Sequence, residues 1–189
     1  MPEISLNILD VAENSTRAGA SLVQITVDVQ PDLDRLTVII ADDGCGMTKE
    51  QVERVTDPFY TSRTTRKVGL GVPFFKLAAE STGGSFSIES EPGKGTTVTA
   101  VFTLNHIDRM PLGDMTATIQ TLIQGHPDTD FLYVYRCGEK EFSLDTREMR
   151  AILGDVSLTT PEISSYIKDY LTENKLCNLG IIGKCLRTL

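Results

Sequence analysis

The sequence predicts an α+β protein, in which an antiparallel-rich sheet packs with helices on one face. Three observations lead to this fold class. The predicted elements run helix, strand, strand, helices, strand, strand, unlike the regular strand–helix alternation of a parallel sheet. The predicted strands alternate apolar and polar residues, and the predicted helices carry an apolar stripe. The chain has 189 residues, which fits one domain, or one domain with an extension, at roughly 150 residues per domain.

The composition excludes several classes of protein. A formal net charge of −8 argues against non-specific binding to nucleic acid or to an anionic membrane surface. No apolar run approaches the ~20 residues of a membrane span. The four cysteines include no C-x-x-C pair and follow no signal peptide, so we expect reduced thiols rather than a disulfide scaffold or a metal site. We therefore expect a cytoplasmic protein without nucleic-acid or membrane partners.

A helix and two strands open the chain. Residues 3–18 place apolar side chains at helical spacing, and Gly19 ends this helix. Residues 21–30 alternate as a strand, a turn with two aspartates follows, and a second strand covers residues 36–41. The predicted apolar faces consist of Ile4, Ile8, Val11 and Ala12 on the helix and Val23, Ile25, Val27 and Val29 on the first strand.

A short helix is predicted over residues 48–56, because Thr48 and Gln51 have the spacing of a capping box. We place a domain boundary after Leu104, so that residues 1–104 form one unit and residues 105–189 a C-terminal α+β extension that packs on it or mediates an interface. The later elements are a loop over 57–71, a helix over 72–82, a hairpin of strands 85–90 and 96–104, a helix over 112–124, strands over 130–136 and 140–144, and helices over 145–153 and 160–175.

Asp10 and Asn14 lie four residues apart and therefore share one face of the first helix. An asparagine amide oxygen is a neutral ligand for a hard cation, and a neighbouring carboxylate can accept a proton from water or a hydroxyl. The pair therefore suits a metal-assisted reaction. A solvated helix face is the alternative interpretation.

Asp42 begins a glycine-broken loop, D-D-G-C-G-M, at the end of the second strand. It has the same parity as the apolar residues of that strand, so its carboxylate points to the buried side and requires hydrogen-bond donors. The exocyclic amine of a base would supply one, and Gly44 and Gly46 would let a flat ligand approach the backbone. The alternative is a tight turn without a ligand.

The stretch from Pro58 to Ala79 contains no acidic residue, although the chain is acidic overall. It contains basic and hydroxyl side chains, and Gly69 and Gly71 open a helix whose N-terminal amides favour a phosphate. A solvated basic loop is the alternative. Thr96, in the later G-K-G-T-T segment, faces the buried side of its strand, and taken alone this segment is a hairpin turn.

Taken together and in order, these segments resemble the motifs of the GHKL ATPase superfamily, which includes DNA gyrase B subunits, Hsp90 chaperones, histidine kinases and MutL. The resemblance spans residues 6–104. It implies a two-layer α/β sandwich, also called the Bergerat fold, that binds ATP with Mg²⁺. The matching segments are A-E-N-S-T-R-A-G-A for the N box, A-D-D-G-C-G-M for the G1 box, T-D-P-F-Y-T-S-R for the F box, V-G-L-G-V-P for the G2 box and G-K-G-T-T-V for the final motif.

The resemblance also implies a role for each matching residue. Asn14 would coordinate Mg²⁺, and Asp42 would accept a hydrogen bond from the adenine amine, with Thr96 joining through its hydroxyl or a water. Residues 57–68 would form a lid, in which the charge and position of Lys67 suggest a phosphate contact. Gly44, Gly46 and Met47 would line the adenine pocket, and Gly69, Leu70 and Gly71 would bring backbone amides to the phosphates.

Two departures from the family pattern affect the expected activity. Asp10 stands where gyrase-like ATPases and anti-sigma-factor kinases have glutamate and histidine kinases usually have asparagine, so the charge is kept on a side chain one methylene shorter. No phosphoacceptor helix precedes residue 1, and the histidines, His106 and His126, lie downstream. We therefore do not expect an intact two-component sensor kinase in this chain.

Three uses of ATP stay open at the level of sequence. The first is a regulatory protein kinase that binds a protein partner, as an anti-sigma factor does, with Asp10 as the catalytic base. The second is a slow ATPase whose nucleotide state switches its conformation or its oligomeric state, such as a homodimer. The third is a nucleotide-sensing module without turnover.

Overall fold

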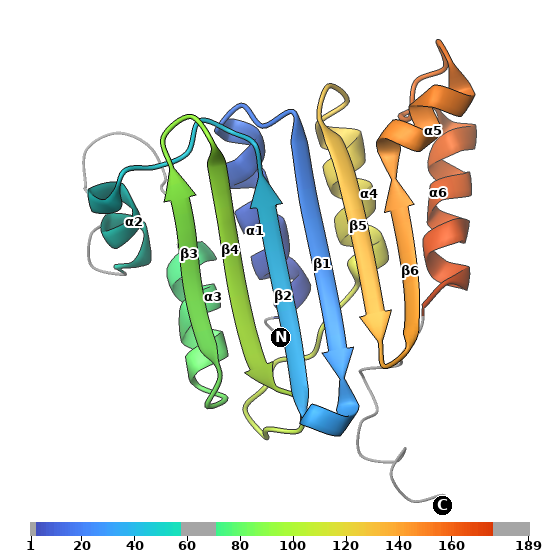
Figure 1. Ribbon diagram of the computed structural model, residues 1–189. Helices are drawn as coiled ribbons and strands as arrows, with labels where there is room; N and C mark the ends of the chain where they lie inside the picture. The colour runs from blue at the N-terminus through green and yellow to red at the C-terminus, as the bar shows by residue number, and fades with distance from the viewer. Residues whose placement is uncertain (1–2, 58–70, 176–189) are drawn as a thin grey trace, which may run out of the picture.

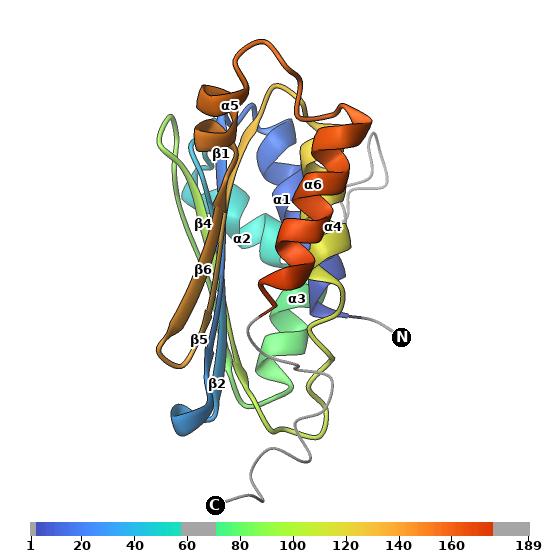
Figure 2. The ribbon, with the colours of Figure 1, turned by 90° about the vertical axis from the view of Figure 1, so that its right-hand side faces the viewer.

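The computed structural model describes residues 3–57 and 71–175 of the chain. Figure 1 shows one sheet with helices behind it. Figure 2 shows the sheet edge-on, with helices lined up against one of its faces. The elements are α1 (Ile4–Arg17), β1 (Leu22–Gln30), a 3₁₀ turn (Pro31–Leu33), β2 (Arg35–Asp42), α2 (Lys49–Thr56), α3 (Gly71–Glu80), β3 (Ser85–Glu91), β4 (Gly95–Thr103), α4 (Met115–Gly125), β5 (Asp130–Cys137), β6 (Lys140–Asp145), α5 (Thr146–Leu153) and α6 (Pro161–Glu173).

The six strands form one sheet in the order β3-β4-β2-β1-β5-β6. All neighbouring strands are antiparallel except β1 and β5, which are parallel. The helices α1, α3, α4 and α6 cover one face, so the predicted α+β fold and two-layer sandwich are confirmed (Figure 2). The segment after Leu104 adds β5 and β6 to the edge that β1 would otherwise form.

One hydrophobic cluster lies between the sheet and the helices, and it includes side chains from both sides of Leu104. The predicted stripe of α1 is buried, with Ile4 and Ile8 at 0% exposure and Val11 at 3%. Full burial of such a side chain contributes about 1.5–3 kcal/mol. Because α1 gains its stability from this contact, the polar residues on its other faces are free to serve a site.

The helix ends follow the local signals in the sequence. The Thr48 hydroxyl accepts from the Gln51 amide, and the Gln51 side chain accepts from the Thr48 amide, which confirms the capping box of α2. Gly19 follows α1 with φ +76°, a conformation that favours glycine. These signals mark the start of α2 and the end of α1, and both helices contribute residues to the cavity described below.

Two further sequence expectations concern the whole chain. Among the described residues, no helix has both the length and the apolar character needed to cross a membrane. Cys45 is a free, exposed thiol, whereas Cys137 is disulfide-bonded. The expectation of reduced thiols is therefore wrong at Cys137, because pairing depends on which cysteines the fold brings together rather than on their spacing in the sequence.

Candidate functional site

A cavity of about 150 Å³ is lined by residues from the C-terminal half of α1, the end of β2 and the start of β4. These three elements come together at one end of the sheet (Figure 1). The cavity volume is about half the ~300 Å³ lower bound of pockets for drug-sized ligands, which suits one part of a nucleotide, such as the base. The polar lining residues are Asn14, Ser15, Asp42 and Thr96. The aliphatic ones are Val11, Ala18, Val55, Val72, Ile88 and Val98. The G1 segment contributes Cys45, Gly46 and Met47.

The structure brings some of the sequence-predicted residues to this cavity and leaves others apart from it. Asn14, Asp42, Gly46, Met47 and Thr96 line it, together with the unpredicted Ser15. Gly44 is buried next to the carboxylate of Asp42. Asp10 and Gly71 contact each other one turn of α1 before Asn14. Lys67, Gly69, Leu70 and most of the 57–68 lid lie outside the described residues.

Asp42 is surrounded by neutral hydrogen-bond donors. The backbone amides of Gly44 and Thr96 donate to Oδ1 at 3.0 and 3.2 Å. The hydroxyl of Ser15 donates to Oδ2 at 2.6 Å. An ionised carboxylate only accepts hydrogen bonds and has about four accepting sites, so these donors leave capacity for a group that donates. The cavity is therefore suited to a ligand with an amine at this point.

Two glycines, one in the G1 segment and one in the final motif, permit close approaches within the protein. A Cβ on Gly46, which has φ +66°, would lie 2.0 Å from the carbonyl oxygen of Glu91. A Cβ on Gly95, which has φ +98°, would lie 1.9 Å from the carbonyl oxygen of Asp42. Glycine at these positions lets the loop after β2 press against the β3–β4 turn, and this contact forms one wall of the cavity.

Ser90 joins the same loop to the β3–β4 hairpin. Its hydroxyl oxygen accepts from the Met47 amide at 2.8 Å and lies 2.9 Å from the Thr96 hydroxyl and 3.0 Å from the Gly95 carbonyl oxygen. If its single hydrogen points to the Gly95 carbonyl, then Thr96 donates to Ser90 and keeps lone pairs that can accept from a ligand or a water. The sequence interpretation missed Ser90, although it pairs directly with Thr96 across the hairpin.

A second aspartate anchors the loop to β1. The Asp43 carboxylate accepts from the amides of Ser21 and Leu22 at 2.8 and 2.9 Å, and from the Ser21 hydroxyl. Burial of the carboxyl raises its pKa, but these hydrogen bonds lower it by more, so the pKa of Asp43 lies below its ordinary value. Both aspartates thus hold the loop, Asp42 from the cavity side and Asp43 from the start of β1.

Asp10 lies on α1 one turn before Asn14 and is exposed. A Cβ on Gly71, the first residue of α3, would lie 2.6 Å from the Asp10 Cβ and 2.9 Å from its Oδ2. Glycine therefore lets the N-terminus of α3 approach the carboxylate, at the end of the helix where amides and the helix dipole favour a phosphate. A carboxylate and the N-terminus of α3 thus come together one turn of α1 before Asn14.

The side-chain oxygen of Asn14 accepts a hydrogen bond from Arg17 Nη1 at 3.1 Å. Within the described stretches, no three or more His, Cys, Asp or Glu side chains converge to hold a metal ion. Mg²⁺ keeps several waters and binds through one or two protein ligands together with substrate phosphates, and an amide oxygen can be one of these ligands. The donor chemistry of Asn14 is therefore compatible with the ion that the sequence predicts.

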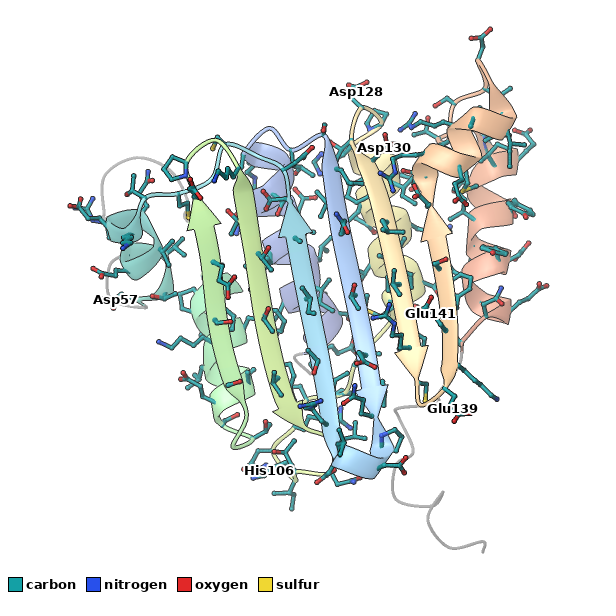
Figure 3. All side chains as sticks on the ribbon, in the orientation of Figure 1. Asp57, His106, Asp128, Asp130, Glu139 and Glu141 are labelled. Atoms are coloured by element: carbon teal, nitrogen blue, oxygen red, sulfur yellow. The ribbon has the colours of Figure 1, made fainter. Side chains whose placement is uncertain are left out.

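His126 connects the C-terminal segment to α1. It follows α4, and its Nε2 lies 2.9 Å from Glu13 Oε1 and 3.5 Å from Thr16 Oγ1. Both contacts are one or two residues from Asn14 along α1. The other histidine, His106, lies at the opposite end of the sheet, beyond β4 (Figure 3). The sequence interpretation gave His126 no role, because its partner is 113 residues away.

The fold is one sheet covered by helices on one face, and its cavity holds a carboxylate that accepts from three neutral donors. A family model described as histidine kinase-, DNA gyrase B-, and HSP90-like ATPase matches residues 3–106. The chain belongs to this family, and the matched residues form a histidine kinase-like ATP-binding module. The resemblance inferred from the sequence motifs is thereby confirmed.

Two similar proteins are much longer than this chain. The non-motile and phage-resistance protein of Caulobacter vibrioides is 33% identical over 121 residues, which are 61% of this chain and 14% of that protein. The sensor protein SrrB of Staphylococcus aureus is 37% identical over 102 residues, which are 51% of this chain and 17% of that protein. The likeness therefore concerns the ATP-binding module rather than the whole of either relative.

Proposed function

We propose that this module is a regulatory protein kinase, which binds ATP with Mg²⁺ and transfers the γ-phosphoryl group to a hydroxyl of a protein partner. The observation that carries the proposal is the contact between Asp10 and Gly71, which sets an exposed carboxylate against the N-terminus of α3. A module that only sensed nucleotide would have no need of a carboxylate at the place where the phosphates are expected.

Recognition of the base would depend on Asp42. Its carboxylate would accept from the adenine amine, and Thr96 would join through its hydroxyl or a water. The apolar walls of the cavity and the loop residues Gly46 and Met47 support this proposal, because a flat heterocycle needs apolar faces and a few convergent polar groups. Gly44 would act indirectly, since its amide donates to Asp42.

The phosphates would lie at the N-terminus of α3. Gly71, with Gly69 and Leu70 before it, would offer backbone amides, and Lys67 would add a positive charge. Asn14 would be a ligand of Mg²⁺, and the bound ion would neutralise charge on the phosphates. To bind the ion, the Asn14 side-chain oxygen has to give up the hydrogen bond that it accepts from the exposed Arg17 side chain.

Asp10 would orient the attacking hydroxyl and take its proton. The hydroxyl oxygen would bond to the γ-phosphorus, the bond between that phosphorus and the β–γ bridging oxygen would break, and ADP would leave. Asp10 has one methylene fewer than the glutamate of gyrase-like relatives. The close approach of α3 that Gly71 permits supports the idea that the shorter side chain still reaches the reacting groups.

The experiment that tests this proposal follows the γ-phosphate. The protein is incubated with γ-labelled ATP and Mg²⁺, first alone and then with a lysate of its host, and free phosphate is separated from phosphoprotein. The kinase proposal expects labelled protein that depends on both ATP and this module. Free phosphate without labelled protein would favour an ATPase, and no loss of the γ-phosphate in either mixture would favour a sensor.

A slow ATPase that switches conformation is the second candidate, and the contact between His126 and Glu13 favours it. We also propose that residues 1–104 form the ATP-binding unit and residues 105–189 an extension that responds to it. Since β5 and β6 continue the same sheet, a change at α1 on ATP binding could reach the extension through this contact and through β1. We further propose that the protein is cytoplasmic, that it binds a protein partner and that the ATPase switch acts through a homodimer.

A further inference from the structure

We infer that Ser15 is a positioning residue for adenine recognition: its hydroxyl holds the Asp42 carboxylate so that one accepting site of Oδ2 is presented to the ligand. The inference rests on the proposed recognition of adenine by Asp42. It adds a residue that neither the sequence motifs nor the comparisons assign. It also names the property that this residue controls, which is the preference for a purine that carries an amine at the position where guanine has a carbonyl.

The geometry of Ser15 is that of a charge-assisted hydrogen bond. Its side chain is buried, with 4% exposure, and its Oγ lies 2.6 Å from Asp42 Oδ2. The other acceptor within reach, the carbonyl oxygen of Val11, is 3.4 Å away. A serine hydroxyl has one hydrogen, and hydroxyl–carboxylate distances of ~2.5–2.7 Å mark the stronger bond. The hydrogen of Ser15 therefore points to Asp42.

The accepting sites of Asp42 are unequally occupied. Oδ1 accepts from the amides of Gly44 and Thr96, whereas among the described residues Oδ2 accepts from Ser15 alone. A carboxylate has about four accepting sites, so the free site belongs to Oδ2. Ser15 and Asp42 both line the cavity. The hydroxyl of Ser15 thus adds to the two amides on Oδ1 the one hydrogen bond that holds Oδ2, the oxygen with a site to offer.

The hydrogen bond also couples two parts of the site. Ser15 follows Asn14 on α1, and Asp42 is the last residue of β2. The bond therefore links α1, which carries the proposed metal ligand, to β2, which carries the residue proposed to bind the adenine amine. Their sequence separation is 27 residues. Preorganisation of this kind raises affinity because the carboxylate does not need to be ordered when the ligand arrives.

The expected effect appears only with ligands that carry the amine. In Ser15→Ala, Oδ2 loses its donor and the carboxylate can rotate or take up a water, so ATP affinity should fall about tenfold. Purine riboside triphosphate lacks the exocyclic amine and gains nothing from the oriented oxygen. Its affinity for the same variant should change by no more than about twofold. Ser15→Cys fills the same space with a weak donor and should lose most of the preference for ATP as well.

The experiment is titration calorimetry of ATP and of purine riboside triphosphate against the whole chain. The proteins are wild type, Ser15→Ala, Ser15→Cys, Asp42→Asn and the double variant Ser15→Ala/Asp42→Asn. Ser5→Ala is the matched control, because Ser5 is a second buried serine of α1, at 2% exposure, and contacts Glu3 rather than Asp42. Thermal melts check that each protein is folded at the temperature of the titration.

The inference expects Ser15→Ala to weaken ATP binding in the wild-type background and to have no further effect in the Asp42→Asn background. An equal loss for both nucleotides, or an undiminished loss in the double variant, would show a packing role and overturn it. If the wild type itself does not distinguish the two nucleotides, the proposed recognition of adenine fails, and that result is separate from a failure of Ser15 alone.

Discussion

Asp42 and Thr96 are direct partners in the ladder between β2 and β4, and the Thr96 amide also donates to the Asp42 carboxylate at 3.2 Å. The backbone of one predicted site residue thus orients the side chain of the other. Gly95 makes this possible, since a Cβ there would lie 1.9 Å from the Asp42 carbonyl oxygen. The carboxylate is therefore built into the sheet rather than carried on a mobile loop.

Asp42→Asn should weaken ATP binding by about 30- to 1000-fold, or about 2–4 kcal/mol, because the new amide group sets a donor against donors. GTP has a carbonyl where ATP has the amine, so it should bind poorly to the wild type. Titration calorimetry of both nucleotides tests this. Equal affinities of the wild type for ATP and GTP would contradict the assignment of Asp42 to the adenine amine.

Asn14→Ala should remove the tightening of ATP binding by Mg²⁺ and leave metal-free adenosine binding nearly unchanged, because only the proposed metal ligand is lost. The measurement is ATP affinity with Mg²⁺ and with EDTA. Asn7→Ala is the matched control, since Asn7 lies two turns earlier on α1 and does not line the cavity. An Asn14→Ala protein that Mg²⁺ still assists as in the wild type would exclude Asn14 as the ligand.

Asp43→Asn tests how the loop after β2 is held. The pKa of Asp43 is lowered in the folded state, so its stabilising effect is present above the unfolded pKa of about 3.9 and is lost as pH falls through the lower folded pKa. Melting temperatures of wild type and variant should therefore differ at pH 7 and converge as the pH falls below about 3.9. Asp32→Asn, an exposed aspartate in the 3₁₀ turn, is the control. A difference that stays constant over this range would speak against the prediction.

His126→Ala should loosen the C-terminal end of α1. Loss of the contact with Glu13 should speed amide hydrogen exchange over residues 13–17 by about fivefold, equivalent to ~1 kcal/mol for one hydrogen bond. Exchange measured by mass spectrometry, with and without ATP, tests the effect. His106→Ala is the matched control, because His106 lies at the other end of the sheet (Figure 3). If both variants exchange alike, the His126 contact does not support α1.

Local signals explain most of what the sequence predicts correctly. The stripe of Ile4, Ile8 and Val11, the capping box of Thr48, and the shared parity of Asp42 and Thr96 each depend on neighbours a few residues away or on strand alternation. Such signals define elements and the faces they bury. They are sufficient to predict the α+β fold class and which motif residues face the helices.

The missed features depend on contacts between distant segments. Ser15 meets Asp42 at a separation of 27 residues, and Ser90 meets Met47 at 43. A serine has no periodicity of its own, so its partner becomes visible only once the strands are in register. The parallel pairing of β5 with β1 is also not predictable, because the alternation of apolar and polar residues in a strand does not show which strand lies beside it.

The most direct test of the account is the rate of γ-phosphate loss from saturating ATP·Mg²⁺ in wild type and Asp10→Asn, with and without lysate. The substitution keeps size and hydrogen bonding but removes the basicity, and loss of a general base slows a reaction by about 10²–10⁴-fold. We predict that ATP affinity stays within severalfold of the wild type while hydrolysis or phosphotransfer falls at least ~100-fold. Asp10→Glu, which restores the longer reach, should be as fast as the wild type or faster. Equal rates for wild type and Asp10→Asn, or a wild-type rate no greater than that of buffer, would contradict the account.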